Sequence, residues 1–333
     1  MKKLISLIVA IYMIQYLPIL LNSCEDRVES AVKELDEGGI TYLLCGFDNA
    51  AENTDSMILV NYSFLSNEIH FIQIPRDTYF EYKGCTKVNS IYPLLRSSGK
   101  TPHEAMETLR ATLSEALGIE IDAYVGYSID AIANLVDDIG GVALDLPNRF
   151  VIKGADGTVL LTLDAGINRV MGDDAIKFLR SRTGYLMGDI GRLDAQKFFI
   201  SAMLKEVKYN LGVNDVLNIC SGSGEGWVIS CKIGDFLKIV LKNGGRLSKI
   251  TAKYTNIPGS TVEDENGVWY YSVCASECEK MFAELGMRYH GRFDSGDLMR
   301  SQNESFAQIY DGENYGTKIY DDSSLSGIEI KIK

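Results

Sequence analysis

Three apolar runs suited to buried strands lie near the start of the chain. They cover residues 40–46, 56–64 and 68–74. The last two are rich in β-branched and aromatic residues and are separated only by residues 65–67, a spacing that predicts a hairpin. These runs indicate a sheet whose first strands come early in the sequence.

Helical patterns alternate with further strands after residue 100. Thr101 is a predicted N-cap, with Pro102 at the first helical position and Glu104 placed to close a capping box, and this helix should run to Gly118. The remaining pattern predicts strands at 121–127, 142–146, 269–271 and 328–332, and helices at 129–139, 173–179, 189–207, 235–242 and 275–285.

Strands that alternate with helices predict α/β layering around a central sheet. The early hairpin introduces an antiparallel pair, so we expect that sheet to be mixed. Length leaves the number of domains open, because ~150 residues per domain suggests two, whereas many α/β domains are larger.

The N-terminus has the pattern of an export or anchoring segment. Lys2 and Lys3 precede an apolar run at 4–21, and acidic residues follow it, which orients the rest of the chain outward. The residues up to Cys24 resemble a bacterial lipobox, in which cleavage leaves that cysteine lipidated. The alternative is an uncleaved signal anchor. Both interpretations place the remaining chain at the extracellular face of a cell membrane.

Composition narrows the possible ligands. Hydrophobic residues make up 46% of the chain and charged residues 23%, as in an ordinary globular protein. The formal net charge of -12 repels a phosphate polymer, so nucleic acid is not expected as a partner. An anionic ligand would therefore need a local cluster of arginine or lysine.

The sequence lacks the residues that several common types of active site require. The chain has 3 histidines, His70, His103 and His290, and none belongs to an H-E-x-x-H arrangement. No P-loop sequence occurs. Ser128 lies two residues after Gly126, as in a nucleophile elbow, but the closing glycine of that motif is missing. We therefore interpret Ser128 as a helix N-cap.

Charged residues gather at the ends of the predicted strands. Asp48 follows the first strand, Asp55 precedes the second, and Arg76 and Asp77 follow the third. Because strand ends converge at one edge of such a sheet, where ligands bind, we expect these side chains to lie together.

A second charged group surrounds the start of a predicted helix. Arg180 and Arg182 lie just beyond the preceding helix, where an extended backbone would place both on one face. Asp189 comes next, and Arg192 and Gln196 are spaced to share one helix face. Carboxylates suit Mg²⁺ and arginines suit phosphate oxygens, so the two groups indicate a phosphate-ester site. Each residue alone is equally compatible with a surface salt bridge.

Short motifs in a fixed order resemble the LytR-CpsA-Psr (LCP) family. They are YLLCGFD at 42–48, TDSM at 54–57, IPRDT at 74–78, KVN at 87–89, DDIGGV at 137–142, GDDA at 172–175, RSR at 180–182, DIGR at 189–192 with Gln196, IPG at 257–259 and WYY at 269–271.

The resemblance implies a three-layer α/β/α domain with a central mixed sheet. It also implies a phosphotransferase of bacterial envelopes, chiefly Gram-positive, that moves a glycopolymer of the wall teichoic acid or capsular polysaccharide type. The donor would be an undecaprenyl-pyrophosphate carrier and the acceptor peptidoglycan, joined by a phosphodiester. An apolar tunnel between sheet and helices would hold the polyprenyl chain, loaded from the membrane bilayer.

The resemblance also assigns roles to residues. Asp48 and Asp55 would hold Mg²⁺, and Asp77 and Asp189 would orient arginines or assist proton transfer. The residues implied to bind substrate are Arg76, Lys87, Asn89, Arg180, Arg182, Arg192 and Gln196.

The sequence departs from the family pattern at two places. Ala195 stands where many members carry arginine, and Asn53 and Thr54 stand where an arginine is common. These losses keep two alternatives open: a non-catalytic protein that binds polyprenyl phosphate, and a pyrophosphatase acting on the same lipid.

The patterns and the resemblance together predict four segments. Residues 1–23 form a signal peptide or membrane anchor, 24–39 a tether, 40–286 the LCP catalytic domain and 287–333 an unassigned tail.

Overall fold

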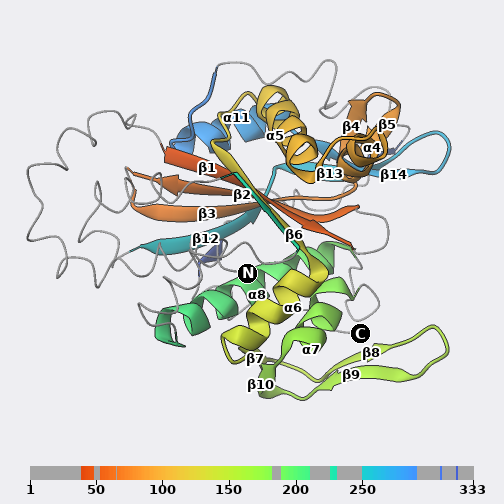
Figure 1. The fold of residues 1–333 in the computed structure, drawn as a ribbon, viewed down its shortest axis with the longest axis vertical. Helices are drawn as coiled ribbons and strands as arrows, with labels where there is room; N and C mark the ends of the chain where they lie inside the picture. The colour runs from red at the N-terminus through yellow and green to blue at the C-terminus, as the bar shows by residue number, and fades with distance from the viewer. Residues whose placement is uncertain are drawn as a thin grey trace, which may run out of the picture.

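A mixed sheet runs through the middle of the protein (Figure 1). The computed structural model describes residues 39–48, 53–64, 66–181, 189–210, 226–230 and 250–290, with short strands at 308–309 and 320–321. Within these ranges the sheet has seven strands. In spatial order they are β11 (Trp227–Ile229), β6 (Ala123–Ser128), β1 (Gly39–Phe47), β2 (Thr54–Ser63), β3 (Glu68–Ile74), β12 (Thr251–Asn256) and β16 (Tyr320–Asp321).

The strand directions confirm that the sheet is mixed. β2 pairs antiparallel with both β1 and β3, which is the predicted hairpin extended by a third strand. β6 joins β1 and β12 joins β3 in parallel, through crossovers that carry the helices.

Helices cover both faces of the sheet and complete three layers (Figure 1). One face is covered by α6 (Ile129–Asp138), α7 (Gly172–Arg180) and α8 (Asp189–Asn210). The other is covered by α4 (Ile91–Ser97), α5 (Pro102–Leu117) and α11 (Ala275–Glu284), with the 3-10 turn η1 (Val88–Ser90) before α4.

Short strand pairs surround these layers, and most of them lack a clear sequence signal. They are β4 (Tyr79–Tyr82) with β5 (Cys85–Lys87), β7 (Val142–Leu146) with β10 (Gly166–Val170), β8 (Phe150–Lys153) with β9 (Val159–Leu163), and β14 (Trp269–Val273) with β13 (Gly259–Glu263) and β15 (Gln308–Ile309).

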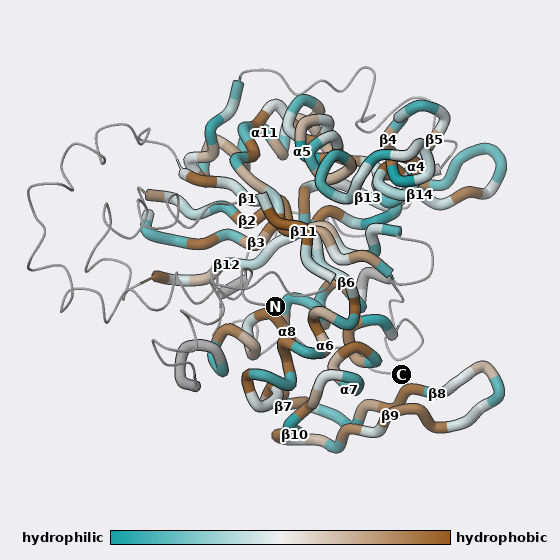
Figure 2. Tube along the Cα trace, in the orientation of Figure 1, coloured by the Kyte–Doolittle hydropathy of each residue, from teal (hydrophilic) through white to brown (hydrophobic). Residues whose placement is uncertain are grey.

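Two apolar cores lie on opposite sides of the sheet. Along β1, Tyr42 and Leu44 face the α6–α8 layer, whereas Leu43 and Cys45 face the α4, α5 and α11 layer. This alternation is the two-residue period of a strand. Figure 2 shows hydrophobic positions recurring through the sheet and along the helices that pack on it.

The predicted start and end of the first long helix are confirmed. The Thr101 hydroxyl accepts the Glu104 backbone N–H at 3.3 Å, and the Glu104 carboxylate accepts the Thr101 N–H at 2.8 Å. Gly118 ends the helix in the left-handed region at φ 64°, which favours glycine. Ser128 is also an N-cap, as predicted, and accepts the Ala131 N–H.

Some predictions fall outside the described residues. They concern the apolar run at 4–21, Cys24, Arg182, the helix at 235–242 and the strand at 328–332.

Helix α7 is anchored on α6 by a close backbone approach. A Cβ atom on Gly172 would come within 2.5 Å of the Ala133 carbonyl oxygen. The Gly172 N–H donates to the Asp137 carboxylate at 2.8 Å. Two of the family-like motifs thus meet here, and the contact fixes the helix whose last residue is Arg180.

We expect Gly172→Ala to destabilise the protein by ~1–3 kcal/mol, because the added methyl group forces α7 away from α6. Urea unfolding followed by circular dichroism measures this change. Asp173→Ala alters the next, exposed residue of the helix and should have a much smaller effect. Equal stability of Gly172→Ala and the unmodified chain would contradict the proposed close packing.

Candidate active site

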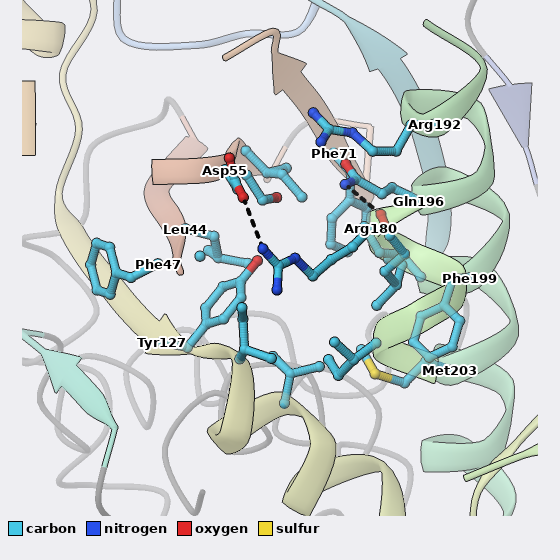
Figure 3. Close-up of a pocket in the computed structure, with 18 residues that line it drawn as sticks. Leu44, Phe47, Asp55, Phe71, Tyr127, Arg180, Arg192, Gln196, Phe199 and Met203 are labelled. Carbon is cyan, nitrogen blue, oxygen red and sulfur yellow. Dashed lines mark hydrogen bonds and ion pairs between the residues drawn. The ribbon is translucent and has the colours of Figure 1, made fainter. Parts of the chain in front are cut away.

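A pocket lies between the sheet and the α6–α8 layer (Figure 3). It encloses about 940 Å³, its open mouth included. The sheet contributes Leu44, Gly46, Phe47, Asp55, Ser56, Ile58, Phe71 and Tyr127 to its lining. The helices contribute Ile129, Ile132, Ile176, Leu179, Arg180, Arg192, Gln196, Phe199, Ile200 and Met203.

The lining is apolar along most of its length and charged where the strands end. Asp55, Arg180, Arg192 and Gln196 supply the charged and amide groups. Figure 3 shows Phe199 and Met203 further along α8, away from Asp55. This arrangement suits a ligand with an anionic head and a long apolar tail.

A β-bulge turns Asp55 into the pocket. Gly46 pairs with Ser56 and Phe47 pairs with Thr54, so Asp55 is an extra residue on β2. Strict alternation would place Asp55 and Ser56 on opposite faces, yet both line the pocket. Thr54 faces the other layer instead, where its hydroxyl donates to the Asn89 carbonyl at 3.1 Å. Bulges near active sites commonly redirect side chains in this way.

Asp55 and Asp77 form ion pairs with Arg76 and Lys87. The charged residues at the strand ends therefore lie together, as the sequence predicts. An Arg76 terminal nitrogen lies 2.8 Å from an Asp55 oxygen, and Arg76 Nε lies 3.4 Å from an Asp77 oxygen. The Lys87 ammonium lies 2.9 Å from the other Asp77 oxygen and 5.1 Å from the centre of the Tyr270 ring. The network fixes the Arg76 guanidinium beside the pocket mouth.

Asp48 and Asn89 form hydrogen bonds to the backbone of the segments that carry this network. The Asp48 carboxylate accepts the Asn53 N–H at 3.2 Å, and the Asp48 N–H donates to the Asn53 carbonyl. The Asn89 N–H donates to the Arg76 carbonyl at 3.3 Å. Both residues therefore support the loops that position Arg76 and Asp55.

Arg180 differs in position from the sequence prediction. It is the last residue of α7 rather than part of an extended segment beyond it, because the backbone leaves helical angles only at Ser181. Its guanidinium lies 3.9 Å from Asp55, and its side chain is 53% exposed. Figure 3 shows the guanidinium reaching into the pocket toward Asp55.

Arg192 and Gln196 share one face of α8, as predicted, and both line the pocket. Arg192 is only 3% exposed. Gln196 is fixed from two sides: its amide oxygen accepts from Gln73 at 3.1 Å, and its amide nitrogen donates to the Leu179 carbonyl at 3.4 Å. Asp189 is the first residue of α8.

Three polar residues on the elements that form the pocket are not singled out by the sequence pattern. Gln73 interrupts an apolar strand, a signal that was available in the sequence. Lys197 is buried on α8 and pairs with Asp194 at 2.9 Å, and burial lowers the pKa of its ammonium. Tyr127 lines the pocket from β6, where its place depends on strand register.

The two family departures have different structural consequences. Ala195 is fully buried in the core beneath α8. Thr54 uses its hydroxyl to join β2 to η1, so the position serves as a structural link.

The described residues do not form a complete metal site by themselves. They fit a metal ion that is bound partly by the protein and partly by a ligand. Among the described residues, no group of three or more histidine, cysteine or acidic side chains is arranged to hold an ion. Asp55 nevertheless presents hard oxygen atoms at the pocket mouth. Mg²⁺ is often bound by one or two carboxylates together with substrate phosphates.

No helix in the described part of the chain is long and apolar enough to cross a membrane.

The family assignment follows from comparison with known proteins. The profile of the LytR_cpsA_psr family matches residues 21–286. The chain belongs to this family. The motif resemblance is therefore confirmed, and the three-layer fold with a mixed central sheet is the LCP fold.

Relatives of this LCP protein include named transferases. The polyisoprenyl-teichoic acid–peptidoglycan teichoic acid transferase TagU of Oceanobacillus iheyensis is 25% identical over 277 residues, which cover 80% of this chain and 82% of TagU. The crystal structure of B. subtilis TagV superimposes with a TM-score of 0.57 at 23% identity, covering 75% of this chain and 97% of TagV. The structure of TagT bound to LIIa-WTA superimposes with a TM-score of 0.54 at 19% identity, covering 76% of this chain and 92% of TagT.

Proposed function

We propose that this LCP protein transfers a glycopolymer from a polyprenyl-pyrophosphate carrier to peptidoglycan. The observation that carries the proposal is the pocket, which is apolar along its length and lined by Asp55, Arg180, Arg192 and Gln196 at one end. A polyprenyl chain matches the apolar part and a diphosphate matches the arginines. The names of relatives such as TagU support the same substrate classes.

The proposed reaction is a phosphoryl transfer. An acceptor hydroxyl attacks the phosphorus that carries the glycan, a phosphodiester forms, and the anhydride P–O bond breaks. The polyprenyl monophosphate leaves with the bonding electrons, and the proton of the attacking hydroxyl passes to water. Arg76, Arg180 and Arg192 would neutralise the oxygens, and Asp77 would orient Arg76. Such reactions depend mainly on positioning and charge stabilisation, which this arrangement supplies.

The proposal includes a divalent ion and a membrane location. Asp55, supported by Asp48, would hold Mg²⁺ against the diphosphate, where the ion would supply further charge neutralisation. The apolar run at 4–21 would keep the domain at the extracellular membrane face, within reach of a lipid-linked donor.

A reconstitution with the full chain tests the function. The protein in detergent is incubated with Mg²⁺, a synthetic polyprenyl-pyrophosphate saccharide and a peptidoglycan oligomer, and products are identified by mass spectrometry. A phosphodiester-linked conjugate is the expected product. Glycan phosphate released without acceptor would indicate a pyrophosphatase, and retained, unconverted lipid would indicate a binding or regulatory protein.

Asp55→Ala should remove the response of the reaction to Mg²⁺. Loss of a charge-neutralising ion costs several kcal/mol of transition-state stabilisation, so we expect transfer to fall on the order of 10²-fold or more. Rates measured across a Mg²⁺ titration give this result. Asp164→Ala removes an 81% exposed carboxylate and serves as the control. A variant at position 55 that still responds to Mg²⁺ would place the ion elsewhere.

A further inference from the structure

One row of residues crosses three neighbouring strands at the charged end of the pocket. Tyr127 on β6 pairs with Gly46 on β1, and Gly46 pairs with Ser56 on β2. Tyr127 and Ser56 both line the pocket, on the two strands that flank Gly46. The three residues are therefore neighbours across the sheet, although Ser56 and Tyr127 are 71 positions apart in the sequence.

Gly46 makes room for the tyrosine ring. A Cβ atom at this position would lie 2.7 Å from a ring carbon of Tyr127 and 3.1 Å from its hydroxyl oxygen. The ring therefore lies against the β1 backbone at Gly46, whose neighbour on the next strand is Ser56. Trp227 on β11 packs against the ring from the other side, with ring centres 5.9 Å apart. The tyrosine ring is held in place by this packing.

The hydroxyl of Tyr127 lies where the two parts of the pocket meet. Ser56 directly follows the bulged Asp55. Figure 3 shows Tyr127 pointing its hydroxyl toward the end of the pocket that contains Asp55 and Arg180. Beyond the ring, Ile129 and Ile132 begin the apolar lining of α6. A ligand whose head contacts Arg180 and whose tail enters the pocket must pass this hydroxyl.

A neutral donor suits this place. Burial raises the pKa of Tyr127 to about 12, so the phenol keeps its proton at physiological pH and can donate it in a hydrogen bond. An arginine here would bring a charge into the apolar part of the pocket at a desolvation cost. A hydroxyl binds a phosphate oxygen without that cost.

We propose that Tyr127 and Ser56 form a neutral phosphate subsite, which binds the lipid-proximal phosphate of a prenyl diphosphate. The subsite rests on the proposed function, since it presumes that a lipid diphosphate occupies the pocket. It adds a recognition element that none of the charged groups supplies: selection of a phosphorylated prenyl chain at the boundary between head and tail.

The test measures binding of a C15 prenyl diphosphate and of the matching C15 prenol to the full chain in detergent. Tyr127→Phe removes the donor and keeps the ring. We expect its affinity for the diphosphate to fall roughly 10- to 100-fold, the usual effect of losing a hydrogen bond to a charged group. Affinity for the prenol should stay unchanged. Ser56→Ala removes the second hydroxyl of the subsite and should weaken diphosphate binding by a smaller factor.

Tyr124→Phe is the matched control. Tyr124 lies on the same strand but packs in the opposite core, where its hydroxyl lies 3.2 Å from a His103 ring nitrogen. This variant should bind both probes as the unmodified chain does. Wild-type affinity of Tyr127→Phe for the diphosphate overturns the subsite while the proposed function stands. An unmodified chain that binds prenol as tightly as diphosphate overturns both.

Discussion

Replacing Arg76 with alanine is expected to abolish transfer and leave the protein folded. The Arg76 guanidinium bridges Asp55 at 2.8 Å and Asp77 at 3.4 Å beside the pocket mouth. Without it, Asp55 and Asp77 lose the cation that bridges them, and among the described residues only Lys87 and the more distant Arg180 remain to offset their charge against an anionic substrate. Loss of one preorganised donor commonly lowers kcat by about 10²–10³-fold, and we expect a loss at the upper end of this range.

The fold should survive because the Arg76 side chain is 19% exposed and its ion pairs are partly solvated. An exposed ion pair contributes up to about 1 kcal/mol to the free energy of unfolding, and breaking a buried one costs about 3–5 kcal/mol, so we expect a loss between these values. Transfer is measured by mass spectrometry of the conjugate, and folding by thermal unfolding. Arg149→Ala is the control, because Arg149 pairs with Asp164 at 3.3 Å on the surface and its side chain is 66% exposed.

A lysine at the same position separates charge from geometry. Arg76→Lys keeps the positive charge but loses the planar fork that reaches two partners, so we expect activity between that of the unmodified chain and Arg76→Ala. An alanine variant that unfolds at room temperature would show that Arg76 is a structural residue. Unchanged transfer by the alanine variant would remove Arg76 from the site.

Filling the pocket at Ile176 is expected to block long-chain donors. Ile176 lines the pocket from α7, and Ile176→Trp would place an indole ring in the space that the polyprenyl chain needs. Burial contributes about 0.8 kcal/mol per methylene, so excluding one five-carbon unit costs roughly 3–4 kcal/mol. Transfer from an undecaprenyl donor should therefore fall by on the order of 10²–10³-fold at limiting substrate.

Two comparisons make this result specific. A donor with a single C5 prenyl unit places much less apolar chain in the pocket, so its transfer should fall much less than that of the undecaprenyl donor. Ile167→Trp places the same ring at a residue that is 78% exposed, and it should leave transfer from the long donor unchanged. Equal losses with both donors would mean that the tryptophan disturbs the charged end instead.

Local sequence signals determined much of the framework. The capping box at Thr101, the glycine at position 118 and the short connection at 65–67 each act within a few residues, so the chain around them carries the necessary information. The short strands β8 and β9 were missed, because their pairing depends on neighbours more than on an alternating pattern. The sequence pattern ends this helix before Arg180, whereas the structure includes Arg180 in it, because helix ends are weakly encoded.

The candidate site shows the same division. The sequence alone contained the motifs that identify the family, and it placed charged residues at strand ends and on one face of α8. Only the tertiary structure decided that a bulge turns Asp55 into the pocket, that Gln73 fixes Gln196, and that Gly46 makes room for the ring of Tyr127. These contacts join distant segments, and a register shift of one residue would move each side chain to the other face of the sheet.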